Sequence, residues 1–390
     1  MTPYDIVIVG GGVVGSASAY YLKKHGFSGT IAIVEQDTSW QSGCTARSCG
    51  GLRQQFSTPE NIALSTFGIR LVKNLAEEFG PEADVGFKEQ GYLILASATG
   101  LPVLAENHAV QIAHGAHNVL LDAAALGQRF AWLNPEGLAG GCFGLSHEGW
   151  VDPYSLAALF RKAAVAQGVA LIQGQVQAVD AHAGRITGVT LASGERLACG
   201  TLVNAAGAGA GALAAMAGID LPVGPRKRYV YVFDCPQATE ALHKAPLTVE
   251  PGGIYFRPEG RNFICGLSPE EHEEPTVFDW EVDHAWFEER IWPGLAERVP
   301  AFEAIKVISA WTGHYDYNAL DQNAVIGPHP DVTNFLFANG FSGHGLQQGP
   351  ASGNAIAELV LHGGYRTIDL TRFGYERITR NEPLYEKNVI

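Results

Sequence analysis

Three glycines near the start of the chain have the spacing of a dinucleotide-binding turn. Gly10, Gly12 and Gly15 follow the apolar run at 4–9, and a helical stretch begins at Ser16. At these positions glycine permits a tight turn, leaves the backbone open to a pyrophosphate, and lets a helix pack closely on a strand. The amino end of the helix supplies free N–H groups and a positive dipole end. The spacing therefore predicts a dinucleotide site.

A carboxylate stands at the distance from this turn that suits ribose binding. A second apolar strand, 31–34, ends at Glu35, which lies 20 residues beyond Gly15. The carboxylate can accept hydrogen bonds from ribose hydroxyls and would repel a 2′-phosphate, so NADP is disfavoured. FAD and NAD both satisfy the pattern, and a glycine-rich turn that binds nothing is the plainer alternative.

The segment after Glu35 is typical of a loop that lines a ligand. Residues 42–51 read SGCTARSCGG, without helical or strand periodicity, and Arg53 follows them. Glycine and small polar residues allow the backbone of such a loop to approach a ligand. We expect this loop to lie against the bound cofactor.

The cysteines and histidines do not predict a metal site. The six cysteines form no CxxC pair, and no spacing of Cys with His fits zinc. In a chain of 390 residues they are typical of free thiols in a reducing compartment. His108, His114 and His117 lie close together, but in an amphipathic stretch where surface histidines are the simpler interpretation.

The composition predicts a folded, acidic protein. Hydrophobic residues make up 46% of the chain and charged residues 17%, which argues against wholesale disorder. The formal net charge of −14 argues against a nucleic-acid partner and against electrostatic docking on anionic lipid. Asp5 interrupts the N-terminal run, so no signal peptide is expected. The apolar stretch 201–219 is mostly Ala and Gly and contains Asn204, which indicates buried backbone rather than a membrane span.

Strands and helices alternate along the chain in the expected secondary structure. Helices are predicted at 60–78, 154–167 and 347–361, with an interrupted helical stretch from 97 to about 130. Strands are predicted within 85–97 and at 169–172, 175–179, 186–191, 195–197, 201–206, 229–233, 253–257 and 335–338. The nucleotide-domain pattern resumes near residue 150, so this domain is expected to be discontinuous.

Three motifs occur together in this chain. They are the turn at 10–15 with Glu35, the strand 202–207 (LVNAAG), and the segment 340–345 (GFSGHG). Together they resemble the D-amino-acid-oxidase-like flavoproteins, which include glycine oxidase, sarcosine oxidase and dimethylglycine dehydrogenase. The resemblance covers essentially the whole chain. It implies an extended FAD and oxidation of the C–N bond of an amino acid or N-alkyl amino acid. A hydride would pass to the flavin, and the resulting imine would hydrolyse.

The resemblance also implies an α/β fold in two parts. One is a discontinuous, Rossmann-like FAD-binding domain, and the other is an α+β substrate domain built on a large mixed sheet that roofs the flavin. We assign 1–84, 151–222 and 323–390, the last with the C-terminal tail, to the FAD-binding domain. The substrate domain takes 85–150 and 223–322.

The expected FAD contacts follow from the same resemblance. They are Gly10, Gly12, Val13, Val14, Gly15, Glu35, Gln36, Arg47, Ser48, Gly50, Gly51, Val176, Ala206, Gly207, Gly343, His344, Gly345, Leu346 and Gln347. Gly343, His344 and Gly345 join a strand to a helix, where backbone N–H groups and the helix dipole would stabilise negative charge near flavin N1. A structural turn with a capping histidine is the alternative.

We expect FAD to be bound noncovalently. Residues 311–317, where sarcosine oxidases carry a linking cysteine, contain none, and the loop 42–51 contains no histidine. His314 is the one residue of this region that leaves a covalent link open.

Four residues are expected to form the catalytic site. Arg53 matches the arginine that binds the substrate carboxylate in monomeric sarcosine oxidase, and a planar guanidinium suits that task. Arg257 is the second candidate anchor, and His314 completes the set. Gln347 stands where those enzymes have a second cation, a lysine, so the pocket is expected to take a different substrate. A surface arginine, or one facing the pyrophosphate, is the alternative for Arg53.

Aromatic and apolar residues of the substrate domain carry two further expectations. Tyr229, Tyr231 and Tyr255 are candidates to line the pocket, although core packing is their more ordinary role. Ile264 takes the place of the lysine that lies over the flavin in monomeric sarcosine oxidase, which predicts poor reaction with oxygen and a quinone or an electron-transfer protein as acceptor. Arg261 and His314 are alternatives that would restore the charge. A further alternative is that Ile264 is simply a core strand residue and that oxygen is activated elsewhere.

The expected function is that of an FAD-dependent amine or amino-acid oxidoreductase. An N-substituted or secondary amino acid is the expected substrate, with a D-amino acid as the alternative. One member of the resembled family is implicated in assembling respiratory complex I, so a flavin-stabilised assembly factor is the second hypothesis. An NAD-dependent dehydrogenase is disfavoured, because its nucleotide domain is usually continuous. The chain shows no mitochondrial presequence, which favours a bacterial, cytoplasmic protein, with peripheral attachment to the inner membrane as the alternative.

Overall fold

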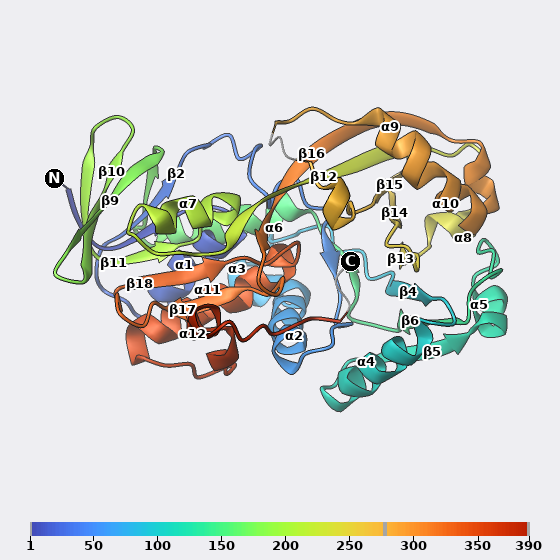
Figure 1. The fold of residues 1–390 in the computed structure, drawn as a ribbon, viewed down its shortest axis with the longest axis horizontal. Helices are drawn as coiled ribbons and strands as arrows, with labels where there is room; N and C mark the ends of the chain where they lie inside the picture. Colours follow the sequence, from blue (N-terminus) through green and yellow to red (C-terminus); the bar gives the residue numbers. More distant parts are fainter. Residues whose placement is uncertain (1, 276–278, 388–390) are drawn as a thin grey trace.

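The structure, a computed structural model, describes residues 2–275 and 279–387. Two eight-stranded mixed sheets lie along the long axis of the molecule, the first at the left of Figure 1 and the second at the right. The first sheet takes its strands from 2–35, 170–204 and 325–339, and the second from 92–144 and 223–318. The α/β fold class is therefore confirmed, whereas the domain boundaries proposed above remain a prediction. Residues 1, 276–278 and 388–390 of the assigned segments lie outside the described residues.

The first sheet has a parallel centre. Its order is β17 (Val325–Pro328), β18 (Phe335–Asn339), β11 (Arg196–Asn204), β1 (Thr2–Val9), β2 (Ile31–Glu35) and β8 (Ala170–Gln173). The hairpin of β9 (Val176–His182) and β10 (Arg185–Leu191) pairs with β11. From β18 to β8 all pairs are parallel, so the carboxyl ends of β1, β2 and β11 lie at one edge of the sheet.

Both faces of the first sheet are buried, as a parallel sheet requires. The helices of this half are α1 (Val13–Lys24), α2 (Pro59–Lys73), α6 (Pro153–Ala166), α7 (Ala210–Ala215) and α11 (Gly345–His362). Ile6 and Ile8 pack with α1, α6 and α11, whereas Val7 and Val9 pack with α7 and the β9–β10 hairpin. Side chains alternate along a strand, so the run YDIVIV fills both layers.

The second sheet forms the other half of the molecule. Its order is β16 (Lys306–Asn318), β12 (Val223–Asp234), β15 (Asn262–Gly266), β14 (Tyr255–Glu259), β13 (Leu247–Val249), β4 (Tyr92–Ala96), β6 (Gly140–Gly144) and β5 (Asn118–Asp122). One of its faces carries an aromatic core, which includes Phe233, Phe256, Phe263 and Phe302. The other face turns toward the loop that carries Arg53.

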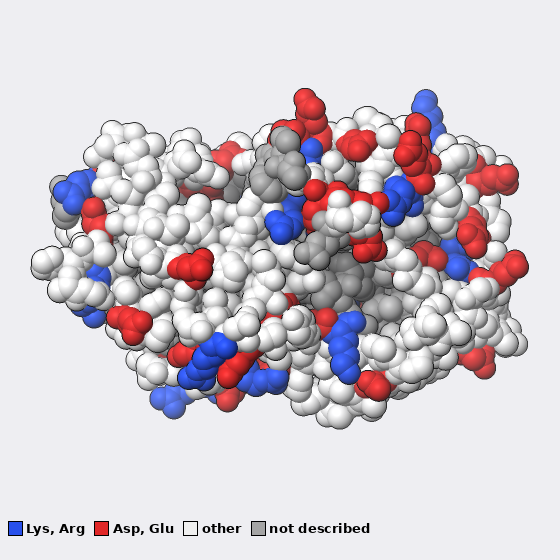
Figure 2. Space-filling model, in the orientation of Figure 1, with Lys and Arg blue, Asp and Glu red and all other residues white. Residues whose placement is uncertain are grey.

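The remaining elements are short or lie on the surface. They are β3 (Gly51–Leu52), β7 (Gly149–Trp150), α3 (Leu75–Phe79), α4 (Leu101–Ala113), α5 (Ala123–Arg129), α8 (Glu240–His243), α9 (His284–Trp286), α10 (Trp292–Arg298) and α12 (Glu376–Arg380). Figure 2 shows acidic side chains gathered over the part of the surface where α9 and α10 lie. Within the described residues, no helix is long and apolar enough to span a bilayer.

Four expectations for secondary structure were wrong in detail. The single helix predicted at 60–78 is two helices, α2 and α3, because Asn74 between them leaves the helical conformation. The two strands predicted at 195–197 and 201–206 are one strand, β11, because Gly200 continues the ladder beside Asp5 rather than ending it. The strand predicted within 85–97 is confined to β4. The stretch predicted as interrupted helix contains β5, whose apolar residues pair with β6. For the strands, the pairing partner, which is distant in sequence, decides the conformation.

Candidate functional site

The glycine turn after β1 has a geometry that excludes side chains. Gly10 has a φ of +102°, and a Cβ added to it would lie 2.1 Å from the carbonyl oxygen of Ala205. A Cβ at Gly15 would lie 1.9 Å from the carbonyl oxygen of Gly10. The tight turn and the close packing of helix on strand are therefore both present, as the spacing predicted.

The amino end of α1 and Glu35 lie beside this turn. Gly12 is the N-cap of α1, and a Cβ there would meet only Thr45 Oγ1, at 3.1 Å. Glu35 Oε2 accepts a hydrogen bond of 2.8 Å from the backbone N–H of Gly11, and Oε1 accepts one of 2.9 Å from Asp37. Each carboxylate oxygen keeps a second lone pair, which can accept a ribose hydroxyl.

A cavity of about 340 Å³ opens at this edge of the first sheet. Seven of the expected cofactor contacts line it, namely Gly10, Gly12, Glu35, Gln36, Val176, Ala206 and Gly207. The sequence did not point to Ala212, Leu213, Met216 or Trp280, which also line it. These side chains reach the cavity through tertiary packing, and no local motif marks them.

The segment 340–345 forms the second wall of the site. Gly343 has a φ of +103°, and a Cβ there would lie 2.6 Å from the ring of Tyr315. The buried carboxylate of Asp316 accepts a hydrogen bond of 3.1 Å from the N–H of Phe341, and burial raises the pKa of Asp316 to about 6. The carbonyl of Asp316 accepts a second hydrogen bond, also of 3.1 Å, from the N–H of Ser342. Asp316 therefore fixes the turn that leads into α11.

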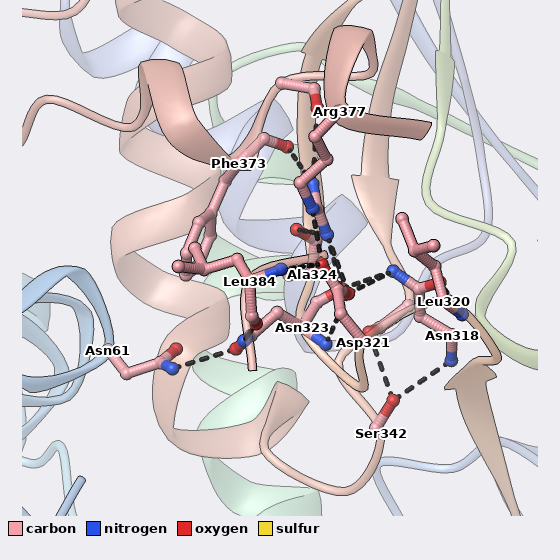
Figure 3. A network of polar contacts seen from close by, with 12 residues as sticks. Asn61, Asn318, Leu320, Asp321, Asn323, Ala324, Ser342, Phe373, Arg377 and Leu384 are labelled. Carbon is pink, nitrogen blue, oxygen red and sulfur yellow. Dashed lines mark hydrogen bonds and ion pairs between the residues drawn. The ribbon is translucent and has the colours of Figure 1, made fainter. Parts of the chain in front are cut away.

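A buried polar network braces the same turn (Figure 3). Arg377 of α12 forms an ion pair with Asp321, with 2.7 Å between Nε and Oδ2. Asp321 Oδ1 accepts from Asn318 Nδ2 at 3.0 Å, and the N–H of Asn318 donates to Ser342 Oγ at 3.0 Å. The C-terminal helix is thereby connected to the turn through one chain of hydrogen bonds.

Arg53 lies at the meeting point of the two halves. It follows β3, is 4% exposed, and its Nη2 donates to Nε2 of His344 at 3.0 Å. Its backbone N–H donates to Oε1 of Gln347 at 2.9 Å, and its guanidinium lies 4.5 Å from the ring centre of Phe56. Burial and the adjacent Arg53 charge hold the pKa of His344 well below its usual range, so this imidazole is neutral and accepts the hydrogen bond. The structure therefore brings Arg53, His344 and Gln347 together.

Arg257 lies elsewhere. Its Nε donates to the carbonyl oxygen of Cys49 at 2.8 Å, and Nη1 donates to the carbonyl of Pro258 and pairs with Glu259. Its guanidinium lies 5.2 Å from the ring centre of Trp150. Among the described residues, its hydrogen-bond partners include none of the Arg53, His344 and Gln347 group. Arg257 supports the loop 48–51 through the carbonyl of Cys49. Arg53 is the better placed of the two candidate anchors, because it alone contacts His344 and Gln347.

The remaining candidate residues of the loop 42–51 hold the loop in place through contacts within it and with neighbouring segments. Arg47 donates to the carbonyls of Gln41 and Thr312, each at 2.7 Å, and stacks on Trp280. Ser48 Oγ accepts from the N–H of Gly50 at 3.1 Å. Gly50 has a φ of +82°, and its close approach to the carbonyl of Val151 leaves no room for a Cβ. These contacts hold the loop in place, and Gly51 continues it into β3.

The remaining candidates lie in two places: one lines the cavity, and three are apolar residues of the core. His314 lines the 340 Å³ cavity, where its Nε2 lies 3.0 Å from the carbonyl oxygen of Asp279 and burial lowers its pKa. Leu346 and Val13 are buried in the helical core of the first half, and Val14 packs against that core. These three apolar residues therefore position α1 and α11, and their backbones, not their side chains, are what a cofactor could contact.

The tyrosines divide between the two faces of the second sheet. Tyr229 and Tyr231 pack in the aromatic core, so their more ordinary role is the one observed. Tyr255 lies on the opposite face, with Tyr92. Tyr315 contacts Gly343 on the side of the 340–345 turn. Burial raises the pKa of Tyr92 and of Tyr255, and raises that of Tyr315 to about 12, so all three phenols stay protonated and can donate hydrogen bonds.

One buried carboxylate near Arg53 carried no signal in the sequence. Glu148 is 1% exposed; its Oε1 accepts from the N–H of Gln54 at 2.6 Å, and its Oε2 accepts from Gln55 Nε2 at 2.7 Å. Burial raises the pKa of Glu148 to about 7, and the nearby charge of Arg53 opposes that rise. Glu148 therefore holds the two residues that follow Arg53. A single glutamate in a loop gives no periodic pattern that could have revealed it.

The described residues contain no cluster of three His, Cys, Asp or Glu side chains that could hold a metal ion. His108, His114 and His117 accordingly do not form such a cluster. The six cysteines are all free thiols in the structure.

The chain is similar to several known flavoproteins. It matches the family described as DAO, FAD dependent oxidoreductase, over residues 5–359. It is 42% identical to FAD-dependent oxidoreductase domain-containing protein 1 of Xenopus laevis, over 99% of this chain and 85% of that protein. It is 26% identical to mitochondrial sarcosine dehydrogenase of Homo sapiens, over 92% of this chain and 40% of that protein. These two relatives are eukaryotic, so they do not support the expected bacterial origin.

Two solved structures share the fold over almost their whole length. L-proline dehydrogenase from P. horikoshii superposes with a TM-score of 0.87 and 25% identity, over 98% of this chain and 100% of that one. Glycine oxidase from Geobacillus kaustophilus gives a TM-score of 0.82 and 25% identity, over 96% and 98%. The glycine turn, the turn before α11 and the match over residues 5–359 agree, and the chain belongs to the DAO family of FAD-dependent oxidoreductases.

Proposed function

We propose that this protein oxidises the C–N bond of an N-substituted or secondary amino acid, giving an imine that hydrolyses in water. The observation that carries the proposal is the buried Arg53, held between His344 and Gln347 at the junction of the two sheets. The planar, positively charged guanidinium can bind a carboxylate through two parallel N–H groups, and its hydrogen bond to the neutral His344 fixes its position. The substrate carboxylate is such a ligand.

The residues present fit FAD. The 340 Å³ cavity suits an adenosine, and Glu35 at its edge suits the ribose. The positive φ of Gly10 and the absence of a side chain at Gly12 leave the backbone open to a pyrophosphate. The loop 48–51 and the turn 343–347 would hold the ring. FAD supplies the hydride acceptor when bound. The amino end of α11, an 18-residue helix, has backbone N–H groups that would be available to the bound ring.

The side chains around Arg53 would orient the substrate. Arg53 binds the carboxylate, and the protonated phenols of Tyr92, Tyr255 and Tyr315 are available as hydrogen-bond donors. Phe56 shields the guanidinium from solvent by stacking on it. Burial of these groups excludes water, which strengthens the pairing of Arg53 with the carboxylate.

The names of similar proteins support an amino-acid substrate. They include sarcosine dehydrogenase, dimethylglycine dehydrogenase, L-proline dehydrogenase and glycine oxidase. The purified protein, kept anaerobic, should lose its yellow colour on mixing with an N-substituted amino acid. Bleaching by D-amino acids alone would favour the alternative substrate class, and no bleaching by any amine would favour the assembly-factor hypothesis.

We predict that substrates with a larger N-substituent than sarcosine are preferred. Gln347 is neutral and bonds to the backbone of Arg53, so the pocket has one cation fewer than the lysine-containing oxidases that it resembles. We expect kcat/KM for proline or N-ethylglycine to exceed that for sarcosine about tenfold, the usual effect of one or two methylene groups in a fitted pocket. Steady-state assays with an artificial acceptor measure this ratio. Equal or better turnover of sarcosine would contradict the prediction, and Gln347→Lys should reduce the preference.

We predict that FAD is held noncovalently. The described sequence at 311–317 has no cysteine, and His314 already contacts the carbonyl of Asp279. Acid precipitation should release essentially all of the yellow colour into the supernatant. Colour that stays in the protein pellet, and that is lost from the pellet in a His314→Asn variant, would show a covalent link through this histidine.

A further inference from the structure

A second cavity, of about 510 Å³, lies behind the loop 48–51. Its walls come from 86–90, from the start of α6 and from the β14–β15 hairpin, and they include Trp150 and Arg257. None of its lining residues lines the 340 Å³ cavity. The two cavities are therefore separate spaces. Two residues that line the second cavity hold the loop 48–51: Arg257 donates to the carbonyl of Cys49 at 2.8 Å, and the N–H of Val151 donates to the carbonyl of Gly50 at 3.0 Å.

Arg257 offers an unused donor to this cavity. The residue is 5% exposed, and Nε and Nη1 are bonded to the carbonyls of Cys49 and Pro258 and to Glu259. Within the described residues, Nη2 has no hydrogen-bond partner. A guanidinium that is nine-tenths buried and has a free N–H edge on a cavity is arranged to bind an acceptor.

Two further side chains add donors around the same space. Lys88 lines the cavity and, in the described part of the chain, pairs with no carboxylate. His243 also lines the cavity and stacks on Phe263; among the residues that the structure describes, its buried Nδ1 has no hydrogen-bond partner.

The carboxylates of the lining already have partners. Glu259 pairs with Arg257 Nη1, and Asp152 caps α6 by accepting from the N–H of Ser155 at 2.6 Å. An incoming anion would therefore meet donors that these carboxylates leave free.

We propose that this cavity binds a small oxyanion, a carboxylate or a phosphate, through Arg257 Nη2 and Lys88. The site is distinct from the proposed substrate site at Arg53. Because Arg257 Nε also holds the carbonyl of Cys49, the anion would stiffen the loop 48–51. The ligand would thus act on the loop that borders the proposed flavin site without entering it.

Calorimetric titration of the FAD-saturated protein tests the proposal, since bound FAD blocks the pyrophosphate site. The probes are inorganic phosphate and acetate, titrated separately to identify the preferred oxyanion. Because acetate can also occupy the proposed carboxylate site at Arg53, each variant is compared in the Arg53→Met background, where at least one probe should bind with one site. Arg257→Gln should weaken binding at least tenfold, the usual effect of losing a charged hydrogen bond. The matched control Arg261→Gln, an exposed arginine on the same hairpin, should leave the affinity unchanged.

Three outcomes would overturn the proposal. They are the absence of binding by both probes, equal affinity in Arg257→Gln, and loss of binding in Arg53→Met, which would place the anion in the substrate site. If Arg257→Gln fails to fold, Lys88→Gln takes its place, because Lys88 is exposed, its contacts with Trp150 are made by its backbone, and in the described part of the chain its side chain makes no hydrogen bond or ion pair. An affinity in Lys88→Gln equal to that in Arg261→Gln would also overturn the proposal.

Discussion

Replacing Arg53 with Met is expected to raise KM for the amino-acid substrate about 100-fold, while FAD remains bound. Met fills a similar volume but cannot bond to a carboxylate. Loss of one partner from a buried charge pair costs about 3 kcal/mol, which corresponds to about 100-fold in binding. The cofactor contacts of the glycine turn and of Glu35 are not altered by this change. Steady-state kinetics give KM, and the flavin absorbance of the purified variant gives the FAD content.

Two further variants separate anchoring from folding. Arg53→Lys keeps the charge and loses the planar fork, so its KM should fall between those of wild type and Arg53→Met. Arg185→Met, an exposed arginine of the β9–β10 hairpin, is the matched control and should behave as wild type. An unchanged KM in a folded, FAD-loaded Arg53→Met protein would remove Arg53 from the substrate site.

The parts of the fold that local rules determine were predictable. The run at 4–9, the three glycines and the strand at 31–34 form a unit of about 30 residues, and each position there has one local physical requirement. The helix predicted at 154–167 is likewise present as α6, which begins at Pro153 and is capped by Asp152. By contrast, β5 depends on its pairing with β6. Likewise, β11 continues through Gly200 because β1 pairs with it on both sides of that residue. Such strands depend on partners that a single sequence does not reveal.

The candidate site shows the same division. Arg53, His344 and Gln347 could be named from motifs, and the structure brings them together from points almost 300 positions apart in the chain. Arg257 was named with them because strand position alone does not say which space a side chain enters. Glu148 could not be named, since its role depends on Gln54 and Gln55 folding around it. Burial, which decides both its pKa and its partners, exists only in the folded chain.

The protein is expected to transfer electrons to a quinone or another acceptor much faster than to oxygen. Ile264 is 1% exposed and pairs with Arg257 in register, so it lies on the same face of the second sheet as Tyr255. An apolar side chain cannot stabilise the negative charge that develops on oxygen in its first one-electron reduction. Two arginines of the second sheet are already paired with carboxylates: Arg228 pairs with Glu274, and Arg257 pairs with Glu259. These carboxylates reduce the positive charge that the two arginines could offer to oxygen.

Stopped-flow measurements after anaerobic reduction by substrate test this expectation. The rate of reoxidation by air should be at least about 100-fold lower than the rate with an artificial quinone, the scale of effect that one well-placed charge has on such a step. Ile264→Lys should raise the rate with air by about tenfold or more, and Ile264→Met, which changes shape but not charge, should not. Burial will lower the pKa of the new lysine, so the gain should grow as pH falls and the amine becomes charged. Reoxidation of the wild type by air as fast as its reduction by substrate would make this protein an oxidase and would show that oxygen is activated without a cation at residue 264.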